Sequence, residues 1–190
     1  MKKLEIITAF TLVLFLALNF YSCKNSSSES KKAEDKTEMV TEAFDAEFIG
    51  NYIYFGPDTL LPQKCTDSLS ARIIVDCKGT SNIMGDIKVH FDFCGNEQGY
   101  YGNVYGYFVD ESNDTLFIGG DYGGRVIEGK TEEHPSFVTS YWKDDFKLIG
   151  GTGKFEGATG KGKTDDYNSS EDPNSHHHWK GTLTLNKERE

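Results

Sequence analysis

Histidines are the side chains of this chain that first suggest metal binding. His176, His177 and His178 are consecutive, but neighbouring residues of a strand point to opposite faces, so at most His176 and His178 share a side. No other His or Cys stands at a matching spacing, since His90 and His134 are isolated. We therefore interpret the three histidines as a solvated strand edge and predict no metal site.

Acidic residues offer a second possibility. The stretch from Asp166 to Asp172 is rich in the oxygen ligands that calcium prefers, yet it lacks the Gly and the spaced carboxylates of a calcium loop. No Ser, His and Asp arrangement and no close carboxylate pair stands out among the thirty acidic residues. The sequence thus predicts no catalytic residue and no cofactor.

A phosphate-binding pattern is present as well. Residues Gly157 to Thr164 satisfy the expression G-x4-G-K-[ST], which in nucleotide-binding proteins connects a strand to a helix. The residues that follow, Asp165 to Ser170, lack the apolar spacing of an amphipathic helix, so no helix N-terminus would face the phosphates. We interpret this match as accidental.

The N-terminal residues are typical of an export signal. Two lysines precede an almost wholly apolar stretch from Ile6 to Leu18, which suits a signal peptide but is short for a membrane span. Ser22 and Cys23 resemble a bacterial lipobox, in which a small residue precedes a Cys that is acylated. The alternatives are an uncleaved anchor and cleavage at another small residue. We expect residues 1–22 to be removed and Cys23 to be lipidated, which would anchor the protein to the outer membrane of a bacterial cell envelope, facing the periplasm or the surface.

A polar tether is expected after this anchor. Residues Lys24 to Thr41 contain four serines mixed with Lys and Glu and have no aromatic residue, so they bury too little to offset the entropy of ordering. A helix over Glu34 to Phe44 is the alternative, although this stretch has no clear apolar stripe. We assign residues 23–45 to the lipidated tether and residues 46–188 to one globular domain.

Composition limits the class of this domain. The formal net charge is −10, which leaves no basic field to displace counterions from phosphates and excludes nucleic acid as a partner. Twenty Gly, 13% aromatic residues and only four Pro indicate many short strands joined by tight turns.

Turn signals divide the domain into eight or nine candidate strands. Such spacing is typical of a closed barrel or a sandwich, and Gly residues inside the strands favour the barrel because they suit strong coiling and close backbone approach. The predicted fold is all-β, a single closed antiparallel barrel of eight strands. The candidate strands are Phe48 to Phe55, Ala71 to Cys77, Asp86 to Phe93, Gly99 to Asp110, Thr115 to Tyr122, Arg125 to Gly129, Phe137 to Leu148, Gly153 to Asp166 and His176 to Leu185.

The most specific stretch is a Gly-rich corner that leads into a strand. Its glycines permit positive φ, and Phe155 is its single bulky apolar group. It resembles the signature of the allene oxide cyclase and dirigent-type β-barrels, a Gly-Gly-Thr-Gly phrase followed by a basic residue, Phe and then Gly-Ala-Thr-Gly. The resemblance covers roughly Gly50 to Leu185. The residues of the corner are Gly150, Gly151, Thr152, Gly153, Phe155, Gly157 and Gly160.

This resemblance implies a fold and leaves function open. Our leading interpretation is a non-enzymatic, envelope-anchored barrel that binds a small apolar ligand or a partner protein at its open end. The alternatives are an enzyme acting on a lipophilic substrate, as in the resembled plant proteins, and a structural or adhesive surface lipoprotein. We expect the aromatic residues to be barrel core rather than a ligand cage: Tyr52, Tyr54, Phe91, Phe93, Tyr105, Tyr107, Phe137, Trp142 and Trp179. The sequence does not predict the oligomeric state.

Three cysteines are left once Cys23 carries lipid. Cys94 ends the candidate strand that starts at Asp86, and Cys65 lies in the loop before Ala71, so both are expected at the rims of the barrel. Period two instead places Cys77 on the apolar side of its strand. Many bacterial barrels of the resembled group also carry one Cys before the strand of Cys77 and one after the next, which matches Cys65 and Cys94. We predict a disulfide between Cys65 and Cys94 with Cys77 free and buried, the rival pairing being Cys77 with Cys94.

Overall fold

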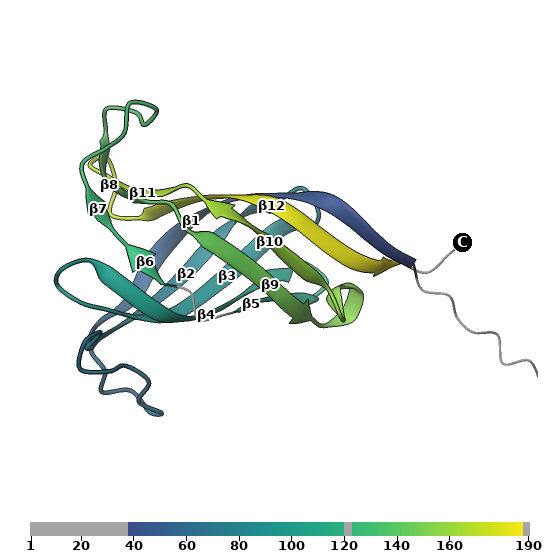
Figure 1. Ribbon diagram of the computed structural model, residues 1–190, viewed down its shortest axis with the longest axis horizontal. Helices are drawn as coiled ribbons and strands as arrows, with labels where there is room; N and C mark the ends of the chain where they lie inside the picture. The colour runs from purple at the N-terminus through teal and green to yellow at the C-terminus, as the bar shows by residue number, and fades with distance from the viewer. Residues whose placement is uncertain (1–37, 120–122, 188–190) are drawn as a thin grey trace, which may run out of the picture. The chain divides into compact units, whose positions relative to one another are not determined.

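The computed structural model describes residues 38–119 and 123–187. Cys23, the predicted signal peptide and most of the predicted tether lie outside the described residues. Eight strands follow one another in antiparallel pairs, and the last pairs with the first, so the sheet closes into a barrel (Figure 1). The predicted closed all-β barrel of eight strands is confirmed. Its strands are β1 (Glu38–Pro57), β2 (Ala71–Ser81), β3 (Gly85–Gly95), β4 (Tyr100–Asp110), β5 (Thr115–Ile118), β9 (Asp145–Gly151), β10 (Thr159–Thr164) and β12 (Ser175–Lys187).

Closure rests on β1, which is longer than the sequence predicts. It pairs with β12 from Glu38 to Gly50 and with β2 from Ala46 to Pro57. The assignment of residues up to 45 to a flexible tether is therefore wrong for residues 38–45, and so is the alternative helix there. The physical reason is alternation, because Phe44 is buried while the residues on either side of it are not. Glu38, Glu42 and Asp45 lower the mean hydropathy of this stretch and hide the strand in the sequence.

Four short strands extend one end of the barrel. β11 (Asp166–Ser169), β8 (Val138–Trp142) and β7 (Ile127–Glu128) continue outward from β12, and β6 (Gly124–Arg125) pairs with β4. Three predicted strands are each divided: β6 from β7 at residue 126, β8 from β9 at residues 143–144, and β10 from β11 at residue 165. No helix within residues 38–119 and 123–187 is long and apolar enough to cross a membrane.

An aromatic cluster fills the middle of the barrel. Trp179 stacks on Phe146 with ring centroids 4.6 Å apart, and Phe108 packs edge-on against Phe44, Phe48 and Trp179. Such edge-on and stacked pairs add to the free energy of burying the rings. All of these side chains are at most 3% exposed.

The Gly-rich corner closes the end of the barrel where β1 begins and β12 ends. A 3-10 turn, η1 (Gly153–Phe155), follows β9 and places Phe155 fully inside the core. Gly153 has φ +57°, and a Cβ there would lie 1.7 Å from a carboxylate oxygen of Asp114. A Cβ at Gly151 would lie 2.0 Å from the Thr115 carbonyl oxygen. The single bulky apolar residue of the corner is thus buried, and the corner closes this end of the barrel.

Candidate functional site

A pocket of about 340 Å³ occupies the opposite end of the barrel from this corner. Its wall is built by inward-facing residues of β1, β2, β3, β4 and β12, together with residues of the outer strands β8 and β11. The wall is mainly apolar, and both tryptophans of the chain belong to it. Its aromatic residues are Tyr52, Phe55, Phe91, Phe93, Tyr100, Tyr101, Trp142 and Trp179.

Strand alternation explains why these side chains converge. Tyr52 pairs with Val75, and Val75 pairs with Phe91, so three adjacent strands present one layer of side chains to the pocket. On β12, His177 and Trp179 are two residues apart and face inward together. The expectation that the aromatic residues form only core is thus incomplete, because several of them also face a cavity. Tyr105 is 51% exposed and belongs to neither group.

Asp166 supplies the charge at the floor of the pocket. This carboxylate is only 2% exposed, and it accepts hydrogen bonds from the indole Nε1 of Trp179 and the backbone N–H of His178, both at 3.2 Å. The bond from Trp179 joins the pocket floor to the aromatic core below. Asp166 is the first residue of the stretch considered for calcium, and it faces the pocket as a single carboxylate.

Ser175, His177 and Asp166 form a chain of polar contacts inside the barrel. The Ser175 hydroxyl lies 2.8 Å from His177 Nε2, and His177 Nδ1 lies 3.2 Å from a carboxylate oxygen of Asp166. The second contact does not meet hydrogen-bond geometry, and Nδ1 has no hydrogen-bond partner among the described residues. Ser175 is 1% exposed and is not part of the pocket wall. This arrangement therefore lacks an accessible nucleophile, and its role is to orient the imidazole of His177.

The interpretation of the histidines as a solvated strand edge is wrong for His177. β12 is flanked by β1 on one side and by β10 and β11 on the other, so it is not an edge. The His177 ring is buried and stacks on Phe48, with centroids 4.8 Å apart. The spacing of Ser175 and His177 could have indicated this position, because period two places the two residues on one face of the strand.

The other two histidines of the run have acidic partners. His176 lies 3.0 Å from Asp172, and His178 lies 3.2 Å from Asp45. Among the described residues, no group of three or more His, Cys, Asp or Glu side chains is arranged to hold a metal ion.

A second carboxylate, Asp144, lies behind the pocket wall at the break between β8 and β9. It accepts a short hydrogen bond from the hydroxyl of Tyr101, and its backbone N–H donates to Thr164 Oγ1 at 3.0 Å. Burial raises the pKa of Asp144; the Tyr101 bond opposes this shift, and the nearby charges of Asp166 and Asp145 add to it. Sequence reasoning missed this residue because the interruption of the strand has no clear sequence signal.

Tyr52 belongs to the pocket wall, and its hydroxyl lies next to Ser175. Burial raises the pKa of the Tyr52 phenol, and a hydrogen bond with Ser175 acts in the opposite direction. Its hydroxyl also lies 3.5 Å from the side-chain oxygen of Asn168. The pocket thus combines aromatic walls with a small number of polar groups, which is the usual composition of a small-molecule site.

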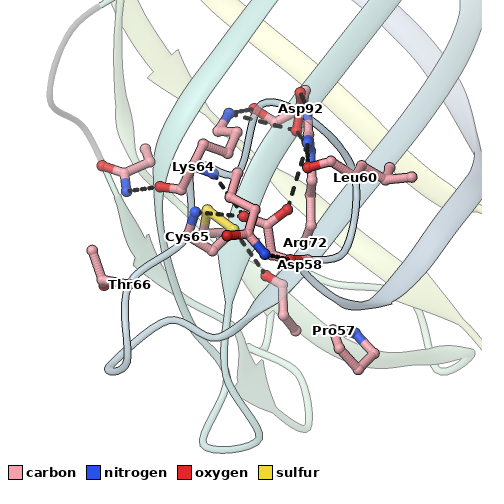
Figure 2. The surroundings of a disulfide bond; sticks show 12 residues. Pro57, Asp58, Leu60, Lys64, Cys65, Thr66, Arg72 and Asp92 are labelled. Atoms are coloured by element: carbon pink, nitrogen blue, oxygen red, sulfur yellow. Dashed lines mark hydrogen bonds and ion pairs between the residues drawn. A yellow bond between two sulfur atoms is a disulfide. The ribbon is translucent and has the colours of Figure 1, made fainter.

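The predicted disulfide between Cys65 and Cys94 is confirmed, and Cys77 is free and buried. The bond fastens the loop after β1 to β3, and Figure 2 shows the ion pairs that surround it. Arg72 donates to Asp92 at 2.5 Å and 2.9 Å and lies 3.5 Å from Asp58. Arg72 alternates with the pocket-lining Ile73 and Val75, so this network belongs to the outer face of the barrel.

The P-loop match is not a nucleotide site. Its second half forms β10, and the strand β11 follows where a P-loop would require a helix. The residues that carry the family resemblance therefore lie at the closed end, and the pocket lies at the other end.

No protein-family model matches the sequence, and no curated protein matches it. Among solved structures, the chain is similar to that of the pterocarpan synthase dirigent protein GePTS1. The two share 13% sequence identity with a TM-score of 0.44, over 81% of this chain and 89% of that chain. This similarity concerns the β-barrel fold.

Proposed function

We propose that this protein is an exported, lipid-anchored barrel that binds a small, largely apolar molecule at its open end. The observation that carries the proposal is the cavity of about 340 Å³, whose wall includes both tryptophans of the chain. A barrel with a purely structural or adhesive role has no need of a cavity, and an apolar pocket with few polar groups is typical of small-molecule sites.

The end of the barrel at which β1 begins agrees with this role. β1 begins at Glu38, which pairs with Lys187 at the end of the barrel opposite the pocket residues Tyr52 and His177. The chain therefore enters the barrel at its closed end, and the mouth of the pocket lies at the other end. Several acyl chains on one residue hold a protein to a bilayer almost permanently, so the barrel itself needs no membrane-binding surface.

Ligand binding is tested with the purified full-length protein in an amphipol. We expect 4-tert-butylbenzyl alcohol, a neutral aromatic probe, to quench the fluorescence of Trp142 and Trp179, which both line the pocket. Val104→Phe fills the pocket and should abolish quenching, whereas Ile53→Phe, at a residue 55% exposed, should leave it unchanged. Native mass spectrometry of the same preparation identifies any ligand that co-purifies. Failure of apolar probes to bind would refute the proposal.

Lipidation is tested separately by metabolic labelling with a fatty-acid analogue. The wild-type protein should carry the label, and Cys23→Ser should not, because acylation requires that thiol. Label retained in Cys23→Ser would refute the assignment of the anchor.

A further inference from the structure

The charged side chains in the wall of the pocket are acidic. Asp166 lies at its floor and Glu97 at its mouth, and no Lys or Arg is part of the wall within the described residues. The guanidinium of Arg125 lies outside the wall, 4.9 Å from the ring centre of Tyr100. The pocket therefore presents negative charge to whatever enters it.

The carboxylates of Asp166 and Asp144 accept hydrogen bonds mostly from neutral donors. Asp166 accepts from an indole N–H and a backbone N–H, and Asp144 accepts from the hydroxyl of Tyr101. These bonds satisfy lone pairs, but they do not cancel the charge. In a cavity walled by aromatic rings, such charge acts over a longer range than it would in water.

His177 places a buried nitrogen that lacks a hydrogen-bond partner beside Asp166. Its side chain is 8% exposed and lies in the pocket wall, and its Nδ1 makes no hydrogen bond among the described residues. If the imidazole carries its proton on Nε2 and donates it to Ser175, Nδ1 is a free acceptor 3.2 Å from Asp166. A single ammonium group, which has three N–H donors, could then donate to both.

Aromatic faces add to this preference. Trp142, Trp179 and Tyr101 line the same cavity, and the face of an aromatic ring attracts a desolvated cation. We propose that the pocket selects a lipophilic amine, with the ammonium group between Asp166 and His177 and the apolar part against the aromatic wall. This inference rests on the proposed ligand-binding function and names the class of ligand.

The test compares three probes of similar shape: 4-tert-butylbenzylamine, 4-tert-butylbenzyl alcohol and 4-tert-butylbenzoate. Tryptophan quenching of the full-length protein in an amphipol reports binding of each probe at pH 7. We expect the amine to bind about tenfold more tightly than the alcohol, which corresponds to ~1.4 kcal/mol. The anionic benzoate should bind most weakly.

The variants separate the pocket charge from the net charge of the protein. Asp166→Asn and Asp144→Asn should each lower the ratio of amine to alcohol affinity several-fold. Asp145→Asn is the matched control, because it removes the same charge one residue away from Asp144, at an exposed side chain paired with Lys163. This control should keep the wild-type ratio. If Asp166→Asn does not fold, Asp144→Asn still decides the question.

Equal affinities for the amine and the alcohol would overturn the inference and leave the proposed function standing, since the pocket would still bind a neutral probe. An amine preference that is retained by Asp166→Asn and Asp144→Asn, or by Asp144→Asn alone if Asp166→Asn does not fold, would also overturn it. If none of the three probes binds, the proposed function itself fails.

Discussion

Replacing Phe155 with Ala tests whether the Gly-rich corner holds the barrel closed. Phe155 is fully buried at the end of η1 and belongs to the central apolar cluster. Full burial of a Phe side chain contributes ~1.5–3 kcal/mol by transfer from water. The cavity left behind adds to this loss, because the neighbouring backbone of β5 and β9 relaxes only in part, and the total expected cost is ~3–5 kcal/mol.

The assay is equilibrium unfolding in urea followed by circular dichroism, with thermal unfolding alongside. For a domain of this size, the loss should lower Tm by about 10 °C and shift the urea midpoint with little change in slope. Glu156→Ala is the control, since Glu156 is the exposed neighbour of Phe155 and its side chain should contribute less than ~0.5 kcal/mol. If Phe155→Ala unfolds at the same urea concentration as Glu156→Ala, the corner does not support the core.

Three further predictions concern the cysteines and the outer ion pairs. Reducing the bond between Cys65 and Cys94, or replacing both residues with Ser, should lower the free energy of unfolding by ~3–4 kcal/mol in urea titrations, because the bond closes a loop of 29 residues. Burial raises the pKa of the free Cys77 thiol, so it should react with a thiol-specific disulfide reagent only after unfolding, as peptide mass spectrometry can show. Burial acts to raise the pKa of Asp92, but its bonds with Arg72 and Lys64 outweigh this effect and lower it below 3.8. The stabilisation from this carboxyl is therefore present above pH 3.8 and is lost as the pH falls below it, and Asp92→Asn should show a smaller loss on acidification than the exposed control Asp86→Asn.

Much of the scaffold follows from local signals in the sequence. The hairpin from Asp110 to Asp114, the corner around Phe155 and the inward-facing side of β2 that carries Cys77 were all predictable, because turn chemistry and period two are local. The N-terminal limit of β1 was not predictable from local signals. Residues 38–45 form a strand only because they pair with β12, more than 130 residues later in the chain. Long-range pairing of this kind overrides local composition.

The pocket was less predictable than the barrel. Asp166, His177 and Trp142 come from three strands, and only closure of the barrel and the interruptions between β8 and β9 and between β10 and β11 bring them to one cavity. In the sequence, the histidine run looked like a solvated edge, because no local signal shows that β12 has strands on both sides. The choice between a filled and a hollow barrel likewise depends on side-chain volumes summed across all strands.

The pocket and the core share several side chains, and Trp179 shows how this couples ligand binding to stability. Trp179 donates to Asp166 at the pocket floor, and its ring stacks on Phe146 in the core. A ligand that packs on Trp179 must bind the folded barrel and not the unfolded chain, which has no cavity. Binding of such a ligand therefore stabilises the fold by an amount that grows with its concentration, ~2.7 kcal/mol at one hundred times Kd.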